Sequence, residues 1–270
     1  MAAIFNSGEK LPLKNLNLGS NKFTIKGCTS LFRAMYANYG VSLARLNLDK
    51  CLMQRKQSEG PDPVFYQFKE ALIQLLKKSK HLTHLSMVNC GIGKDTMLAL
   101  GQGLHQNTRL QSLMLRGNKI QASGLCSFVS ACYENPKLVI RNLDFGSNQL
   151  CDKTGYELAR CFKALRTLES ISLKDNNLAN ESSDALLYLV KENTNICKCN
   201  LELNLIKYIS LVEIDKTCAK NKAQFRRQDL PSIRREIRGL RKKRGEAGGF
   251  QIDQLNAKLK HQKTQIGENL

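Results

Sequence analysis

An eleven-position pattern recurs seven times along this chain of 270 residues: Leu-x-x-Leu-x-Leu-x-x-Asn/Cys-x-Leu, with other aliphatic or aromatic residues replacing some of the leucines. The copies begin at Leu13, Leu43, Leu82, Leu110, Ile140, Leu168 and Ile196. Their starts are 30, 39, 28, 30, 28 and 28 residues apart. Self-similarity at such a period predicts a solenoid, in which each repeat is one supersecondary unit and neighbouring repeats share a continuous core.

The spacing within the pattern predicts a short strand followed by a turn. Leucines at i, i+3 and i+5 cannot all share one face of a helix, whereas the last two share one face of a strand because strand side chains alternate. An Asn amide at the ninth position can donate to and accept from the backbone of the turn, and a Cys thiol fits the same small slot and donates weakly. We therefore interpret the ninth-position row as structural: Asn21, Cys51, Cys90, Asn118, Asn148, Asn176 and Asn204.

Helical patterns fill the intervals between the predicted strands. Asp62 and Pro63, followed by Phe65, Phe68 and Leu72, are typical of a capped amphipathic helix with Asp as its N-cap and Pro at the first helical position. Further apolar stripes of helical spacing lie within residues 97–104, 125–132, 156–162 and 185–190. Strands that alternate with helices predict an α/β array with a parallel sheet.

A repeat of 28 to 30 residues with a helix on its outer side resembles the ribonuclease-inhibitor-like subfamily of leucine-rich repeat proteins, which includes Ran GTPase-activating protein, the carboxyl domain of tropomodulin and several ciliary axoneme proteins. The resemblance covers residues 11 to about 221 and implies a horseshoe arc of about seven repeats. Residues 206–221 are similar to the helix that ends such arrays, and the polar insertion 54–60 is expected to be a surface loop. We divide the chain into a leucine-rich repeat domain, 1–221, and a basic helical tail, 222–270.

The amino-terminal end departs from the family pattern. Repeat arrays need a polar cap at each end, yet only about a dozen residues precede Leu13. Ala2, Ile4 and Phe5 fold over the first repeat, or a partner covers it, or the first repeat frays. These three alternatives remain open at this point.

The inner face of the predicted sheet is the surface on which this fold usually binds partners. Interface hot spots are enriched in Trp, Tyr and Arg, and the rows of this face hold two Arg, Arg45 and Arg116, and no aromatic residue. The middle row is Asn17, Asn47, Ser86, Met114, Asp144, Ser172 and Asn200. These short, nearly neutral side chains predict no high-affinity site on the inner face.

We assign no catalytic residue, cofactor or metal ligand from the sequence. His84 is the one histidine of the inner face, and its neighbours across the strands, Arg45 and Ser112, do not make a general base. Cys197 and Cys199 have the wrong spacing for a zinc site and lack a second Cys or His pair nearby. We interpret most of the ten cysteines as reduced thiols packed as small hydrophobic groups, and we expect a non-enzymatic protein.

Positive charge is concentrated near the carboxyl end. The chain has 42 Lys+Arg and 23 Asp+Glu, and residues 220–244 hold eleven basic and two acidic residues. Ile233, Ile237 and Leu240 recur there at i, i+4 and i+7, which predicts a narrow apolar stripe on an Arg-rich helix. We expect partner contacts at Arg234, Arg235, Ile237, Arg238, Arg241, Lys242, Lys243 and Arg244. The alternative is a solvated appendage.

The expected function is a non-enzymatic protein-protein interaction scaffold in a large assembly. Its most specific form is a structural component of the ciliary or flagellar axoneme, in the cytoplasm and cytoskeleton, with tubulin or axonemal proteins as partners, because the resemblance includes axonemal proteins and acidic tubulin surfaces suit the charge. The first alternative is a nuclear or ribonucleoprotein adaptor that binds RNA through the tail, and the second is a GTPase-activating or other enzyme-regulating module. No apolar run approaches the roughly 18 residues that a bilayer span requires. The narrow apolar stripe of the basic helix lacks large aromatic residues, so we expect no membrane partner.

Overall fold

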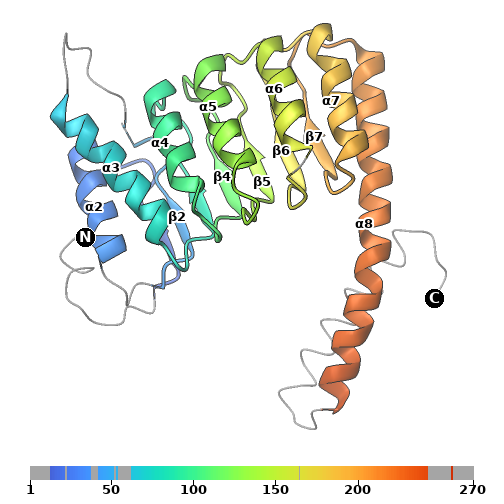
Figure 1. The fold of residues 1–270 in the computed structure, drawn as a ribbon, viewed down its shortest axis with the longest axis horizontal. Coiled ribbons are helices and arrows are strands. Elements are labelled where there is room, and N and C mark those ends of the chain that lie inside the picture. The colour runs from blue at the N-terminus through green and yellow to red at the C-terminus, as the bar shows by residue number, and fades with distance from the viewer. Residues whose placement is uncertain are drawn as a thin grey trace.

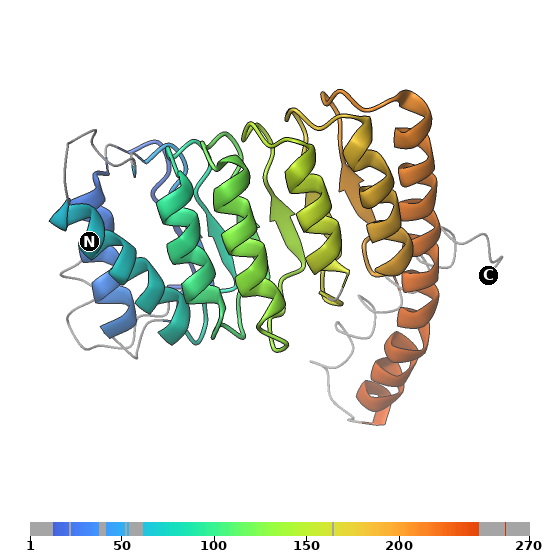
Figure 2. The ribbon, with the colours of Figure 1, turned by 45° about the horizontal axis from the view of Figure 1, so that its top comes forward.

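The computed structural model describes residues 13–21, 23–37, 42–51, 53, 62–163, 165–242 and 257, with the backbone alone for 226–242. In this part of the chain seven parallel strands form one open sheet in chain order, and each strand is followed by a helix (Figure 1). The helices form a second layer on one side of the sheet (Figure 2). The predicted α/β leucine-rich repeat solenoid is therefore confirmed. The residues proposed to cap the first repeat, Ala2, Ile4 and Phe5, and the insertion 54–60 lie outside the described residues.

Each strand has three residues, and the helices are longer. The strands are β1 (Asn15–Asn17), β2 (Arg45–Asn47), β3 (His84–Ser86), β4 (Ser112–Met114), β5 (Asn142–Asp144), β6 (Ser170–Ser172) and β7 (Lys198–Asn200). The helices are α2 (Ile25–Ala37), α3 (Pro63–Lys78), α4 (Lys94–Leu104), α5 (Gln121–Tyr133), α6 (Asp152–Phe162), α7 (Asn180–Glu192) and α8 (Tyr208–Lys242). In α3 the predicted cap is confirmed, because Asp62 accepts from the backbone N–H of Val64 and Phe65 at 2.9 and 3.1 Å.

The strand register matches the register of the repeat. The central strand residues pair directly across the sheet, from Leu16 to Leu46 and onward to Ile171 and Cys199. These residues face the helices and, from Leu46 onward, are buried, whereas the residues on either side of them face the inner surface. The inner rows inferred from the sequence therefore lie in line, as predicted.

Each strand is followed by a turn with a left-handed residue at the same position. The φ angles of these residues lie between 53° and 70°. The residues are Ser20, Lys50, Asn89, Gly117, Ser147, Asp175 and Leu203. Gly adopts this conformation most readily, because a Cβ atom crowds the backbone there, and Asn and Asp tolerate it because their short polar side chains hydrogen-bond locally. The left-handed residue directly precedes the ninth-position residue of the pattern.

The ninth-position row joins neighbouring turns. Asn118 Nδ2 donates to the carbonyl oxygens of Met87 and Leu115 at 2.9 and 2.7 Å. Its Oδ1 accepts from the N–H groups of Cys90 and Ile92 at 2.9 and 3.0 Å. One buried side chain thus satisfies four backbone groups of two repeats, and the structural role predicted for the row is confirmed.

Asn148 makes only half of this set of bonds. Its Nδ2 donates to the carbonyl oxygens of Leu115, Phe145 and Gly146 at 3.0, 3.0 and 2.8 Å, but its buried Oδ1 has no hydrogen-bond partner. We therefore expect Asn118→Ala to lower the free energy of unfolding more than Asn148→Ala does. Each buried polar group without a hydrogen-bond partner costs about 1 to 3 kcal/mol. Asn118→Ala leaves two backbone N–H groups without a partner in addition to the carbonyl groups. Urea denaturation of both variants measures the difference, and an equal or larger loss for Asn148→Ala would contradict this account of the row.

A second row of buried Asn residues, which the sequence reasoning missed, closes the other end of the repeats. Asn193 Nδ2 donates to the carbonyl oxygens of Phe162 and Leu165, both at 2.9 Å. The row consists of Asn107, Asn135, Asn193 and Asn221, which are all buried. Each member follows a helix or, at Asn221, lies within α8. The available signal was an Asn three residues before the first apolar residue of the next repeat, as at Asn107 and Asn193.

The core lies between the sheet and the helices and is contiguous along the array. Phe128 and Phe145 meet edge to face with ring centroids 5.6 Å apart. The ten cysteines are free, and most are buried. Burial raises the pKa of the Cys90 thiol to about 12, so the thiol stays protonated at neutral pH. Its Sγ donates to the Leu48 carbonyl at 3.1 Å, as expected for Cys in the slot of the ninth position.

The last helix joins two stretches that the sequence analysis assigned to different units. α8 runs without a break across residue 221, from the end of the array into the basic segment. Pro231 lies inside it, where the ring removes one backbone donor without ending the helix. α8 also packs directly against β7, with Ile214 and Cys218 buried, so it covers the end of the sheet. The division into a domain of 1–221 and a tail of 222–270 stays a prediction.

Candidate interaction surfaces

The inner face is hollowed at its amino-terminal end. A hollow of about 440 Å³ lies over β1 to β4. It is lined by Asn15, Leu16, Asn17, Arg45, Leu46, Asn47, His84, Leu85, Ser86, Ser112 and Met114. The exposed side chains of this set are Asn15, Asn17 and Arg45, and those of Leu16, His84 and Met114 are partly buried. The absence of a high-affinity site on this face stays a prediction.

His84 does not form part of a catalytic group among the described residues. Its Nδ1 lies 2.8 Å from Thr83 Oγ1, and the strand register places Arg45 and Ser112 on either side of it. Partial burial, and then the positive charge of Arg45, lower the pKa of His84 below its usual value. The imidazole is therefore neutral at physiological pH and has no carboxylate beside it to orient a proton transfer.

Asp49, a carboxylate in the turn after β2, is bound to groups of its own repeat and of the next repeat. Its Oδ1 accepts from Ser86 Oγ at 2.5 Å and from the Val88 N–H at 2.8 Å, and its Oδ2 accepts from Asn47 Nδ2 at 3.0 Å. These bonds tie the turns after β2 and β3 together. Asp49 thus has a structural role.

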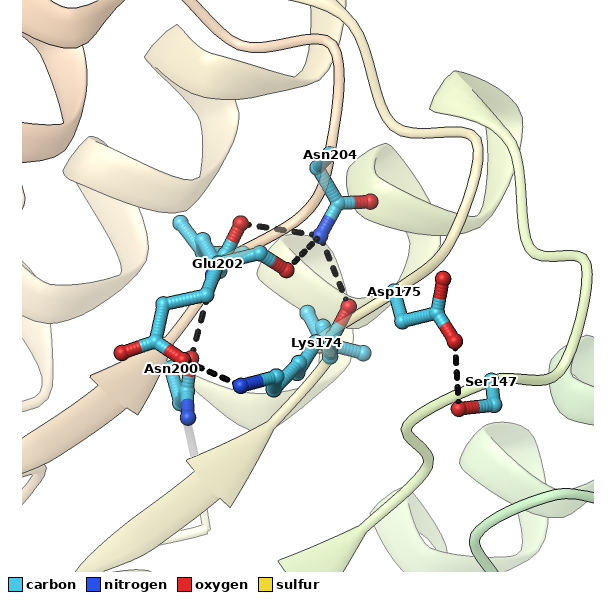
Figure 3. Close-up of polar contacts among 8 residues, drawn as sticks. Ser147, Lys174, Asp175, Asn200, Glu202 and Asn204 are labelled. Carbon is cyan, nitrogen blue, oxygen red and sulfur yellow. Dashed lines mark hydrogen bonds and ion pairs between the residues drawn. The ribbon is translucent and has the colours of Figure 1, made fainter.

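An ion pair and a hydrogen bond join neighbouring repeats at the other end of the inner face. Lys174 Nζ lies 2.6 Å from Glu202 Oε2, and Ser147 Oγ donates to Asp175 Oδ2 at 2.8 Å (Figure 3). The bond to Lys174 lowers the pKa of the Glu202 carboxyl. The side chain of Glu202 is 65% exposed and that of Lys174 is 30% exposed, so water screens the pair and it adds little stability.

Two classes of site receive no support from the described residues. In that part of the chain no group of three or more His, Cys, Asp or Glu side chains is placed to hold a metal ion. No helix there is both long enough and apolar enough to cross a bilayer.

The partner-contact residues predicted from the sequence lie mainly on the second half of α8. Arg234, Arg235, Ile237, Arg238, Arg241 and Lys242 belong to this helix, whereas Lys243 and Arg244 lie outside the described residues. This half of α8 extends past the array into open space (Figure 1). At 3.6 residues per turn, Arg234, Arg238 and Arg241 share one face of the helix. Asn221 is the last buried residue among the α8 residues whose side chains are described.

A surface that the sequence analysis missed lies where the chain passes from β7 to α8. Four large apolar side chains are exposed there: Leu203, Leu205, Tyr208 and Ile209. We call these four residues the β7–α8 patch. The available signal was a comparison of the last repeat with the one before it, which carries polar residues at the same four positions.

Comparisons with known proteins agree with the architecture. A family model described as a leucine-rich repeat matches residues 78–101. The solved structure of leiomodin-1 actin-binding site 2 is similar with a TM-score of 0.55 and 15% identity, covering 66% of this chain and 99% of that one. The tropomodulin C-terminal domain of Caenorhabditis elegans gives a TM-score of 0.45 and 12% identity, covering 77% of this chain and 98% of that one. No curated protein sequence matches the chain.

The class is defined by the repeat pattern, the seven-stranded parallel array within the described residues, the family-model match and the likeness to leiomodin-1. The chain is a leucine-rich repeat protein. At 15% identity the likeness to leiomodin-1 shows the shared fold.

Proposed function

We propose that this chain is a non-enzymatic protein-protein interaction scaffold that is built into a cytoskeletal assembly. The observation that carries the proposal is the shape and charge of α8. Its first half closes the array, and its second half projects past it, within a segment of eleven basic and two acidic residues at 220–244 (Figure 1). A rigid array with a projecting basic helix suits attachment to an acidic protein surface.

The more specific form of the proposal is a structural component of the ciliary or flagellar axoneme. It is supported by the resemblance of the repeat to axonemal members of the subfamily and by the acidic surface of tubulin. The actin filament is the second candidate, because a solved structure with this fold is named as an actin-binding site. An RNA-binding nuclear adaptor is the alternative that the same basic segment suggests.

Sedimentation of the purified full chain with microtubules, and separately with actin filaments, tests the proposal. We expect the chain to pellet with one of the two polymers, and the bound fraction to fall as salt is raised, because exposed charges are screened over about 8 Å at physiological ionic strength. Polyglutamate serves as a control competitor, since it reproduces charge without the shape of a filament. A chain that stays in the supernatant with both polymers contradicts a cytoskeletal role, and crosslinking of α8 to RNA in cells would favour the adaptor.

A further inference from the structure

The β7–α8 patch is unusual for its exposure. The side chains of Leu203 and Leu205 are each 70% exposed, and those of Tyr208 and Ile209 are 80% and 78% exposed. All four lie within seven consecutive residues, in the turn after β7 and at the start of α8. Large apolar side chains gathered on a soluble surface mark a contact site more often than scattered ones do.

The fold does not require apolar residues at these positions. In the preceding repeat the equivalent residues, 28 positions earlier, are Asp175, Asn177, Asn180 and Glu181. In the repeat before that they are Ser147, Gln149, Asp152 and Lys153. All eight are polar, and the two repeats form the same strand, turn and helix. The apolar character is therefore a property of the last repeat alone among these three.

Leu203 is the clearest example of an apolar residue that the fold does not require. It occupies the left-handed turn position with φ 57°, which disfavours a residue with a Cβ atom. Four of the six other repeats have Ser, Asn or Asp there, and one has Gly. Leu203 gains neither burial nor a favourable backbone conformation at this position. A role in binding accounts for an apolar side chain that the fold itself does not use.

The backbone under the patch is held by the array. The Leu205 N–H donates to the Leu178 carbonyl at 2.7 Å, and the Lys207 N–H donates to Asn180 Oδ1 at 2.8 Å. Asn204 Nδ2 donates to the carbonyl oxygens of Leu173 and Leu201, both at 2.9 Å. The backbone of the patch is therefore preorganised, which lowers the entropic cost of binding.

We propose that the β7–α8 patch docks an acidic, amphipathic segment of a partner protein. The apolar side chains of the segment would cover the four patch residues, and its carboxylates would meet Lys207, which is exposed and lies between Leu205 and Tyr208 in the sequence. The net charge of +19 attracts an acidic partner and disfavours a second copy of the chain. The patch lies at the opposite end of α8 from the basic residues 234–242, so this inference does not depend on the proposed function (Figure 1).

The test uses two designed helical peptides with the same Leu face, one with Glu and one with Lys on the polar face. Binding is measured by fluorescence anisotropy to the full chain, in a background where Arg234, Arg235, Arg238, Arg241, Lys242, Lys243 and Arg244 are replaced by Gln. This background removes simple attraction to α8, so failure here is distinguishable from failure of the cytoskeletal proposal. We expect the Glu peptide to bind at least tenfold more tightly than the Lys peptide.

A matched variant takes its residues from other repeats of the chain. Leu203→Ser, Leu205→Gln, Tyr208→Asn and Ile209→Ser place at each position the residue found at the equivalent position of another repeat, and they leave the net charge unchanged. We expect this variant to keep the wild-type melting temperature and to weaken binding of the Glu peptide at least tenfold. Lys207→Gln should reduce the preference for the Glu peptide over the Lys peptide.

Three results would overturn the proposal. The first is equal binding of the Glu peptide by the four-residue variant and its parent. The second is a wild-type chain that forms dimers in analytical ultracentrifugation while the variant stays monomeric, because the patch would then join two copies. The third is loss of binding to phosphatidylserine vesicles in the variant without any effect on the peptides, because the patch would then contact lipid.

Discussion

Replacing Leu115 by Asp is expected to unfold the array. Leu115 is fully buried directly after β4, and its N–H donates to the Asp144 carbonyl at 2.8 Å. Truncating a buried Leu costs about 2 to 5 kcal/mol, and burying an unpaired charge costs more. The total is comparable with the whole free energy of unfolding of a domain, about 5 to 15 kcal/mol. Circular dichroism during thermal denaturation measures the loss.

Leu98→Asp provides the matched control for this prediction. Leu98 lies on α4 and is 43% exposed, so the same chemical change places the carboxylate in water. Substitutions at such sites usually change the free energy of unfolding by about 0.5 kcal/mol or less. A Leu115→Asp protein that melts with the wild type would show that the register of the repeats is wrong.

Neutralising the basic half of α8 is expected to release the chain from its partner. The variant replaces Arg234, Arg235, Arg238, Arg241, Lys242, Lys243 and Arg244 by Gln in the full chain. Contacts between exposed charges are screened by salt, so the wild-type complex should weaken steeply as salt rises, whereas the residual binding of the variant should depend little on salt. Co-purification from cells over a series of salt concentrations measures both effects.

A second variant tests the apolar stripe with the charge unchanged. Ile233→Ser, Ile237→Ser and Leu240→Ser should also weaken the complex if the helix lies in a groove of the partner. The array should remain folded in both variants, because the buried contacts of α8 end at Asn221 among the residues whose side chains are described. If both proteins stay in the complex at moderate salt, the array carries the contact and the end of α8 is a solvated appendage.

The local architecture was predictable from the sequence, because each repeat contacts only its neighbours and its pattern is fixed by strand alternation and turn chemistry. The strand and turn at Leu113, Leu115 and Asn118 follow from their spacing, since no other short element buries these leucines together. Asp62 and Pro63 likewise predict the start of α3, because Asp is a favoured N-cap and Pro is favoured at the first helical position. The rows of the inner face follow from the same register.

Features that depend on distant groups were decided only by the tertiary structure. Asn221 acts as a structural residue because Val190 and Ile196 present carbonyl oxygens to it, at 2.8 and 3.0 Å, from another part of the chain. Asn148 lacks a partner for its Oδ1 although its sequence context matches that of Asn118. A hydrogen bond of this kind requires both the donor and the acceptor in place, and a local sequence pattern identifies only one of them.

At the end of the array, too, the sequence predicted one part and the tertiary structure decided the other. The sequence contains Leu203, Leu205, Tyr208 and Ile209, but their apolar character alone does not say whether they are buried or exposed. α8 packs across β7 through Ile214 and Cys218 and leaves the patch outside the core. Composition and spacing determine which residues are apolar, whereas the three-dimensional closure of the last repeat determines which of them water still reaches.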